Sequence, residues 1–300
     1  MVSSSQAGEP PFAFIGCTID RAAARRTDAA WLQQVRRAES SRCLVVKSAA
    51  QLLLSEDASL GHLPAATLPP DTDLTFLGVT HDGCALFAFD AGEEEALAHE
   101  ELAGRTFAEL RAIGADLAAN EAGLAAHAVA MVGWHRRHRY CGLCGSPTVV
   151  EEAGHSRRCS SCGAQHFPRT DPAVIMLVSA GDRCVLGKRP GLGRWTVLSG
   201  FVEPGETLEA AVAREVFEEV GVRVIEARYA ASQPWPFPAN LMLGFEAEAE
   251  YGALTVDDEL DDARWFTRQE LHESIASGVI PTPASISIAS YLIRGWLERD

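Results

Sequence analysis

Three glutamates, Glu215, Glu218 and Glu219, follow one another at the spacing i, i+3, i+4. Residues three and four apart share one face of a helix, so we expect the three carboxylates to lie together. Carboxylates at this density repel one another without a cation, and their hard oxygen atoms suit Mg²⁺ or Mn²⁺. Such an ion can hold a diphosphate and activate a water molecule for attack at phosphorus. The alternative interpretation is a solvated acidic helix face.

The residues around these glutamates predict the helix that carries them. Pro204 and Gly205 break the chain, Thr207 is a suitable N-cap, and Gly221 is a natural stop. Apolar residues recur every four positions and predict a buried stripe beside the carboxylates: Leu208, Val212, Val216 and Val220. We expect Arg214 to orient one of the glutamates by a salt bridge.

Two C-x-x-C pairs indicate a second metal site. Cys141 and Cys144 form the first pair and Cys159 and Cys162 the second, and a glycine follows each pair. Four thiolates satisfy tetrahedral Zn²⁺ and leave no open position, so we expect a structural zinc ribbon. A redox C-x-x-C or an iron–sulfur site is a less natural interpretation of two symmetric pairs. A ribbon alone would also suit a non-catalytic nucleic-acid-binding module, which is the alternative of a different functional class.

Prolines alternate with other residues in the segment that starts at Ser232. The three prolines predict an extended, polyproline-like rod that holds two aromatic faces, and Gln233 could read the edge of a base. A rigid loop that lines the core and a proline-rich docking peptide are the alternatives. The candidate binding residues are Gln233, Pro234, Trp235, Pro236, Phe237, Pro238, Ala239 and Asn240.

The chain has 300 residues, of which 47% are hydrophobic and 22% charged, as in ordinary globular proteins. We expect an N-terminal α+β domain at 1–135, a zinc ribbon at 136–168 and a third domain at 169–300. Strands are expected at 44–46, 75–80, 85–89, 173–179 and 184–186. Helical spacing is expected at 106–140, with a break near Asn120, and again at 283–297.

The 26 basic and 41 acidic residues give a formal charge of −15, which disfavours binding of nucleic acid through bulk charge. A local basic cluster at 135–139 indicates either a solvated helix end or a contact to phosphate. The sequence contains no run of about 18 apolar residues, so no transmembrane helix is expected. The first residues lack the pattern of a secretory signal, so we expect a cytoplasmic protein.

The stretch 200–222 fits the pattern G-x5-E-x7-R-E-U-x-E-E-x-G-U, where U is apolar, and so resembles the Nudix hydrolases. This resemblance implies an α/β/α Nudix fold for the C-terminal domain. It also implies that the carbonyl of Ser199 completes the shell of the catalytic metal.

The proline-rich segment is similar to the SQPWPFPxS array of the NudC-type NADH pyrophosphatases, which also have an N-terminal domain and a four-cysteine ribbon. Asn240 replaces the serine of the array, and Phe167 replaces a tyrosine that follows the ribbon. By resemblance, Phe167 and Phe201 stack on the substrate, Ala289 contacts it, and Glu259 reaches the metal or the water. A homodimer is also implied.

We therefore expect an NAD(H) pyrophosphatase that releases AMP and nicotinamide mononucleotide. Glu215, Glu218, Glu219, Glu259 and Ser199 would hold Mg²⁺ or Mn²⁺, with Glu218 or Glu219 as the base, and Zn²⁺ would be structural. The main alternative is hydrolysis of the 5′ end of NAD-capped RNA at the same site. The sequence is also compatible with ADP-ribose as the substrate, or with a ribbon-based binding module whose C-terminal domain is inactive.

Overall fold

The computed structural model describes residues 12–47, 50–92, 102, 105–191, 193–280 and 286–299. The chain divides into two compact units. Unit 1 contains Phe14–Thr170 and the short segment Trp235–Ala239. Unit 2 contains Asp171–Pro234 and Asn240–Asp300, together with Phe12 and Ala13.

Unit 2 is built on a seven-stranded mixed sheet. Its path is β12–β11–β10–β15–β14, with β13 paired to β10 and β16 paired to β11. The strands are β10 (Asp171–Ala180), β11 (Arg183–Lys188), β12 (Trp195–Thr196), β13 (Leu198–Phe201), β14 (Val224–Trp235), β15 (Asn240–Ala249) and β16 (Asp262–Thr267). The neighbours β10 and β15 are parallel, whereas β10 is antiparallel to β11 and β13.

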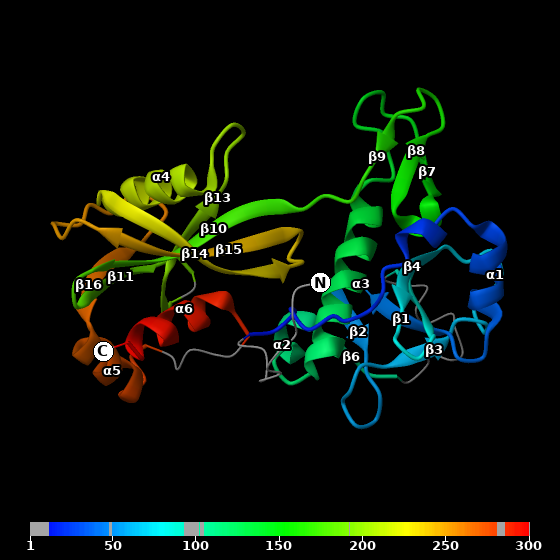
Figure 1. Cartoon of the computed structure of the whole chain (residues 1–300), viewed down its shortest axis with the longest axis horizontal. Coiled ribbons are helices and arrows are strands. Elements are labelled where there is room, and N and C mark those ends of the chain that lie inside the picture. Colours follow the sequence, from blue (N-terminus) through cyan, green and yellow to red (C-terminus); the bar gives the residue numbers. More distant parts are fainter. Residues whose placement is uncertain are drawn as a thin grey trace. The chain divides into compact units, whose positions relative to one another are not determined.

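Alternate side chains of β10 point to opposite faces of this sheet and enter two separate cores. Val174 and Met176 pack on the side of helix α4 (Leu208–Val220). Ile175 and Leu177 pack on the other side, with α5 (Arg268–Ala276) and α6 (Ile288–Leu297). Figure 1 shows the sheet between α4 and the pair α5 and α6. The expected α/β/α arrangement is therefore confirmed.

Unit 1 is an α+β structure around a six-stranded sheet, as expected. The strands are β1 (Arg42–Lys47), β2 (Gln51–Leu53), β3 (His62–Pro64), β4 (Leu74–Val79), β5 (Ala85–Asp90) and β6 (Phe107–Glu109), on the path β4–β5–β1–β2–β6 with β3 beside β1. After η1 (Ala23–Arg25), α1 (Ala29–Arg37) covers one face of the sheet, where Trp31 packs against Phe76. Helix α3 (Ala119–Arg137) covers the other face (Figure 1).

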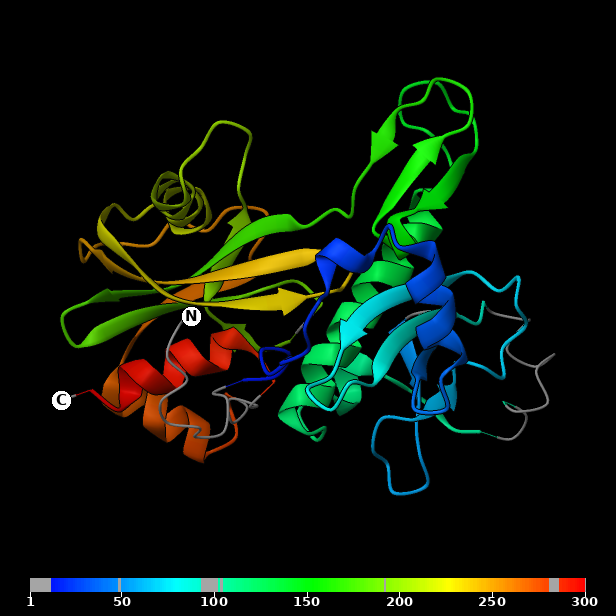
Figure 2. The same cartoon turned by 45° about the vertical axis from the view of Figure 1, so that its right-hand side comes forward.

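A small three-stranded antiparallel sheet follows the C-terminal end of α3 in unit 1. It has the order β7 (Thr148–Glu151), β8 (Ser156–Cys159), β9 (Gln165–His166), with η5 (Glu152–Gly154) between the first two strands. The Nε2–H of His155 donates to the carbonyl of Phe76 in β4 at 2.7 Å. Figure 2 shows the three strands beyond the end of α3. The ribbon is thus anchored to the larger sheet of unit 1.

The prediction of helical structure at 106–140 is wrong for the first part of this range. Residues Phe107–Glu109 form β6 and pair with β2, and a four-residue helix, α2 (Leu110–Ile113), follows before α3 starts at Ala119. Pairing with a neighbouring strand overrides the local helical spacing here. The expected last helix starts at Ile288, and residues 283–285 lie outside the described residues. None of the helices in the described parts of the chain is both long enough and apolar enough to cross a membrane.

Candidate metal and substrate site

Helix α4 forms as the sequence predicts. The Thr207 side chain accepts a hydrogen bond from the backbone N–H of Ala210, and Gly221 ends the helix with φ 72°. Val212, Val216 and Val220 are completely buried in the core beneath the helix. The carboxylate face is therefore held at a fixed rotation relative to the sheet.

Glu219 is the most buried of the three glutamates, with 1% of its surface exposed. Its Oε1 atom accepts a hydrogen bond from Arg189 Nη2 at 2.8 Å, whereas Oε2 has no hydrogen-bond partner. Burial, assisted by the charges of Glu215, Glu259 and Asp257 and opposed by that of Arg189, raises the pKa of Glu219 to about 8. A buried carboxylate with an unsatisfied oxygen is a site that a cation would stabilise.

Arg189, which follows directly after β11, links two of the predicted metal ligands. The nitrogen that donates to Glu219 also donates to the carbonyl of Ser199, and it lies 3.2 Å from the Ser199 hydroxyl. The guanidinium thus neutralises the oxygen atoms that the resemblance assigns to the metal shell. Sequence reasoning missed this residue, because only the pairing of β10 with β11 and β13 brings positions 189 and 199 together.

Arg214 holds the remaining carboxylates of the helix. Its Nη1 atom lies 2.9 Å from Glu215 and 2.8 Å from Glu218, and its Nε atom lies 2.6 Å from Glu206. The hydrogen bond from Arg214 lowers the pKa of Glu206 to about 2, whereas burial raises the pKa of Glu215. Arg214 also donates to the carbonyl of Phe201 at 2.9 Å. The expectation that Arg214 orients a glutamate is confirmed.

Gly200, the first residue of the 200–222 pattern, allows β13 to approach this cluster closely. A Cβ atom at this position would lie 1.8 Å from the carboxyl carbon of Glu215. Any larger residue would therefore displace that carboxylate. Glu259 is exposed, but its charge raises the pKa of both Glu215 and Glu219, so it belongs to the same electrostatic neighbourhood.

The donor atoms of this cluster are of the types that a divalent ion such as Mg²⁺ or Mn²⁺ prefers. A backbone carbonyl and carboxylate oxygens are the ligands that such ions prefer. The unsatisfied Glu219 Oε2 and the raised pKa values of Glu215 and Glu219 both indicate carboxylates that gain from a nearby cation. Glu218 lies on the same face, with 55% of its side chain exposed.

The four cysteines of the ribbon lie together. Their sulfur atoms are all within 4.8 Å of one another, and all four thiols are free. Backbone N–H groups of Leu143 and Ser161 donate to sulfur atoms of Cys141 and Cys159 at 3.4 Å. This arrangement fits a closed four-thiolate zinc site, which is structural rather than catalytic.

The proline-rich segment is extended only in its first part, from Ser232 to Trp235 at the end of β14, and not throughout as the sequence predicts. Residues 236–239 form a turn between the neighbouring strands β14 and β15, where the chain must reverse, and the Phe237–Pro238 peptide bond is cis. The rings of Trp235 and Phe237 lie 5.2 Å apart. Arg111 lies over both rings, 4.8 Å from the centre of Phe237 and 5.5 Å from that of Trp235. Both aromatic faces are thus in contact with other residues of unit 1.

The side chain of Gln233 is completely buried. Its Nε2 atom donates to the carbonyls of Ala13 and Ile286, and its Oε1 atom accepts from the N–H of Ile288. The amide group is therefore fully hydrogen-bonded to backbone groups, two of which lie near the start of α6. In this structure Gln233 does not present a free edge to a base.

The other predicted binding residues differ in exposure. Phe167 and Phe201 are 61% and 57% exposed, so both rings are free to stack on a ligand. Asn240 has a buried Oδ1 atom without a partner, and Ala289 is half-buried against the core below α6. Pro234 and Pro238 are exposed, Pro236 is buried, and Ala239 is half-buried.

Comparison with protein families assigns three consecutive regions. Residues 169–282 match the NUDIX domain, residues 136–167 match the NADH pyrophosphatase zinc ribbon domain, and residues 40–134 match the NADH pyrophosphatase-like rudimentary NUDIX domain. Among solved structures, a NUDIX hydrolase from Nitrosomonas europaea is 25% identical, with a TM-score of 0.45, over 53% of this chain and 90% of that one.

Several curated relatives are similar in sequence. The NAD-capped RNA hydrolase NudC of Mycobacterium bovis is 36% identical over 295 residues, which cover 92% of each chain. The NAD-capped RNA hydrolase NUDT12 of Homo sapiens is 43% identical over 59% of this chain and 42% of that protein. The NAD-capped RNA hydrolase NudC of Stutzerimonas stutzeri is 45% identical over 55% of this chain and 58% of that protein. The match therefore spans about half the length of the last two relatives.

The fold, the carboxylate helix and the four-cysteine ribbon define a Nudix domain joined to a zinc ribbon. The chain belongs to the NudC family of Nudix hydrolases.

Proposed function

We propose that the protein hydrolyses the diphosphate of NAD(H) and releases AMP and nicotinamide mononucleotide. One observation carries this proposal: a buried carboxylate, Glu219, lies at the 200–222 pattern with an unsatisfied oxygen and a raised pKa. Membership of the NudC family supports the dinucleotide as the substrate class.

Glu215, Glu218, Glu219, Glu259 and the carbonyl of Ser199 would hold Mg²⁺ or Mn²⁺. When bound, such an ion neutralises the charge of the diphosphate and lowers the pKa of a water molecule. Glu218 or Glu219 takes the proton of the attacking water. Arg214 positions Glu215 and Glu218 through its ion pairs, and Gly200 leaves room for the Glu215 carboxylate.

Phe167 and Phe201 would stack on the rings of the dinucleotide, because both aromatic faces are exposed. We assign to the same substrate the segment Pro234, Trp235, Pro236, Phe237, Pro238, Ala239 and Asn240, together with Ala289. Gln233 would belong to this site through its backbone hydrogen bonds, not through a contact to a base. The proposed functional division is an N-terminal domain at 1–135, a ribbon at 136–168 and a hydrolase domain at 169–300. Zn²⁺ at the four cysteines would stabilise the fold of the ribbon and take no part in catalysis.

Hydrolysis of NAD-capped RNA is the second candidate function, because three relatives carry that name. The same bond would be broken at the same carboxylates, and the net charge of −15 would be compatible with an RNA held mainly at its cap. Arg136 is already paired with Asp90, so exposed Arg139 is the better probe. Arg139→Glu should leave the rate of NADH hydrolysis unchanged and slow the hydrolysis of capped RNA if the RNA body is bound at this residue.

We also propose a cytoplasmic homodimer, as the family resemblance implies. Light scattering after size-exclusion chromatography would give twice the mass of the 32.2 kDa chain. A monomeric mass would contradict this assembly without affecting the proposed chemistry.

The experiment that tests the function uses purified protein, NADH and Mn²⁺, with separation of the products by chromatography. The wild type should form AMP and reduced nicotinamide mononucleotide in equal amounts, and Glu219→Gln should be slower by about 100-fold or more. Absence of AMP from the wild type would refute the activity. Equal rates for both proteins would refute the role of the carboxylate cluster and would favour a ribbon-based binding module with an inactive hydrolase domain.

A further inference from the structure

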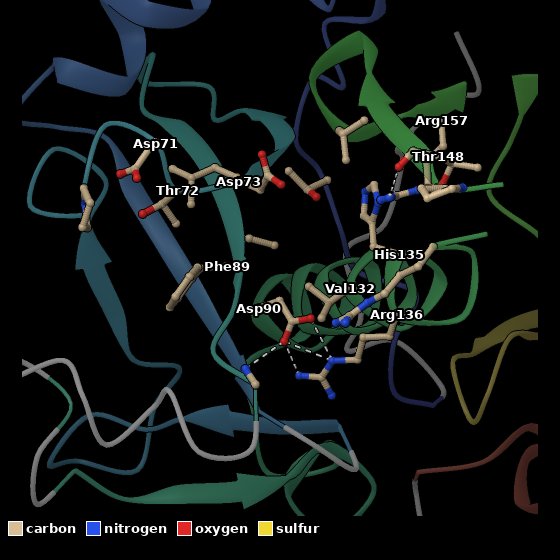
Figure 3. A pocket seen from close by; sticks show the side chains of 18 of the residues that line it. Asp71, Thr72, Asp73, Phe89, Asp90, Val132, His135, Arg136, Thr148 and Arg157 are labelled. Carbon is tan, nitrogen blue, oxygen red and sulfur yellow. Dashed lines mark hydrogen bonds and ion pairs between the residues drawn. The ribbon is translucent and has the colours of Figure 1, made fainter. Parts of the chain in front are cut away.

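A cavity of about 800 Å³ lies within unit 1, whereas the carboxylate helix belongs to unit 2. Its walls come from the loop before β4, the end of β5, the C-terminal end of α3 and the first strands of the ribbon. Figure 3 shows Asp71, Thr72 and Asp73 on one side of this cavity and His135 and Arg157 on the other. Its volume is in the range of small-molecule binding sites.

Arg157 of β8 is a buried cation on the wall of this cavity, with 9% of its surface exposed. Its Nε and Nη2 atoms donate to the Thr148 hydroxyl at 2.7 Å and to the Thr148 carbonyl at 2.9 Å. Its Nη1 atom lies 2.9 Å from His135 Nδ1, and His135 Nε2–H donates to the Gly154 carbonyl. Burial, followed by the charge of Arg157, lowers the pKa of His135 to about 4, so the imidazole is a neutral acceptor.

All of these partners are neutral. No carboxylate of the described residues lies within ion-pair distance of Arg157. Three of its five N–H groups are used, which leaves two for a ligand. Its hydrogen-bond partners are all neutral, and the charge of Asp73 acts on it without a direct ion pair. A buried cation held in this way gains from an anion that reaches it. Arg157 therefore provides the features of an anion-binding group.

The other charges of the cavity restrict the ligand. Arg136 is neutralised by Asp90, whose two carboxylate oxygens lie 3.0 and 2.9 Å from Arg136 Nε. Arg139 is exposed at the rim and has no carboxylate partner among the residues that the structure describes. Among the lining residues, the charges of Arg139 and Arg157 are balanced by those of Asp71 and Asp73. This balance disfavours a polyanion and favours a small ligand with one anionic end and one end rich in hydrogen-bond donors.

Tyr140 also lines the cavity, and 68% of its surface is exposed. An exposed ring on the wall of a cavity that is also lined by arginines can stack on the base of a nucleotide. We propose that this cavity binds a nucleoside monophosphate. Arg157 and Arg139 receive the phosphate, Asp73 accepts hydrogen bonds from the sugar hydroxyls, and Tyr140 stacks on the base. This site is independent of the proposed hydrolysis, although AMP and nicotinamide mononucleotide, its expected products, both have the required chemistry.

Calorimetric titration of the zinc-loaded full chain with AMP and with nicotinamide mononucleotide, without Mg²⁺ or Mn²⁺, tests this proposal. We expect at least one of them to bind, about tenfold more weakly in Arg157→Met and several-fold more weakly in Arg139→Gln and Asp73→Asn. The matched control is Arg158→Gln, because Arg158 is exposed and pairs with Glu151 on the same sheet. This control should bind like the wild type.

The remaining outcomes overturn the proposal. They are the absence of binding of both nucleotides to the wild type, unchanged binding by Arg139→Gln and Asp73→Asn, or equal affinity for inorganic phosphate. Tighter binding of a single-stranded RNA decamer, lost in Arg139→Gln, would identify a polynucleotide site instead. Because Arg157→Met removes internal hydrogen bonds, its melting curve is recorded, and the exposed Arg139→Gln variant decides the outcome if Arg157→Met does not fold.

Discussion

At the residue scale, the guanidinium of Arg189 donates hydrogen bonds to oxygen atoms that we propose as metal ligands. Arg189 donates to Glu219 and to the carbonyl of Ser199, both of which we propose as ligands. A cation that binds these oxygens must replace Arg189 or share them with it, and the two positive charges repel each other. If these oxygens are the metal ligands, we expect Arg189 to stabilise the metal-free form of the site and to become available for the diphosphate when the metal binds.

Arg189→Met tests this exchange. The substitution removes the competing cation, so we expect Mn²⁺ to bind about three- to tenfold more tightly and the KM for NADH to rise. Electron paramagnetic resonance of free Mn²⁺ measures the affinity directly. Arg194→Met, on the exposed loop that follows, should leave the affinity unchanged. Weaker Mn²⁺ binding in Arg189→Met would mean that the arginine supports the loaded site instead.

The spacing of Glu215, Glu218 and Glu219 was enough to predict a shared carboxylate face, and Thr207 and Gly221 were enough to predict the helix ends. The burial of Glu219 could not be predicted, because it depends on how α4 packs on the sheet. The role of Arg189 could not be predicted either, because its partner Ser199 lies ten residues away on another strand.

At the element scale, Gln233 connects the start of α6 to the rest of unit 2. Gln233→Ala would leave the Ile288 N–H and two carbonyls without a partner, so we expect a loss of about 2–4 kcal/mol in the free energy of unfolding. Urea denaturation measures this loss, and exposed Gln269→Ala is the control. Unchanged stability together with a raised KM for NADH would favour the base-reading role predicted from the sequence.

Buried histidines make the stability of unit 1 depend on pH. Burial lowers the pKa of His155 to about 4 and that of His127 to about 3, both from an ordinary value of 6.5. The unfolded chain therefore binds these protons first as the pH falls, and each histidine weakens folding by up to about 1.4 kcal/mol per pH unit below pH 6.5. Above pH 6.5 the two states bind equally few protons and the effect is absent.

The variant His155→Gln can still donate to the Phe76 carbonyl but does not titrate. Its melting temperature should fall less than that of the wild type between pH 6.5 and 5. Parallel curves for the two proteins would show that His155 does not contribute to the acid sensitivity. Loss of zinc in acid affects both proteins, so the difference between their curves is the informative quantity.

The strands around 44–46, 75–80, 85–89, 173–179 and 184–186 were predictable because continuous apolar runs between turn residues favour buried strands. The strand at Phe107–Glu109 could not be predicted in this way, because its conformation comes from pairing with β2. The prolines around Trp235 predicted an extended segment, which holds only as far as Trp235 at the end of β14; the turn that follows depends on the neighbouring strands β14 and β15.

At the scale of the whole molecule, the ribbon has little apolar core of its own and depends on its four thiolates. We expect removal of zinc by a chelator to unfold residues 136–168 and to increase proteolysis there, because metal binding supplies folding free energy. Limited proteolysis followed by mass spectrometry locates the cleavage sites. A zinc-free protein with the same protease resistance but no activity would contradict a purely structural role.

The net charge of −15 is partly explained by the site. Glu206, Glu215, Glu218, Glu219 and Glu259 are concentrated around α4, where Arg189 and Arg214 offset only part of the charge. The excess negative charge attracts a divalent ion to this part of unit 2.

The measurement that tests the central claim most directly is Mn²⁺ binding to the wild type and to Glu219→Gln, at a pH above 8 where Glu219 is ionised. The zinc content and the melting temperature of both proteins are recorded in parallel. Our account predicts that the variant keeps its zinc and its fold but binds Mn²⁺ at least tenfold more weakly. Equal Mn²⁺ affinity in the two proteins would contradict the assignment of the buried carboxylate as the catalytic metal ligand.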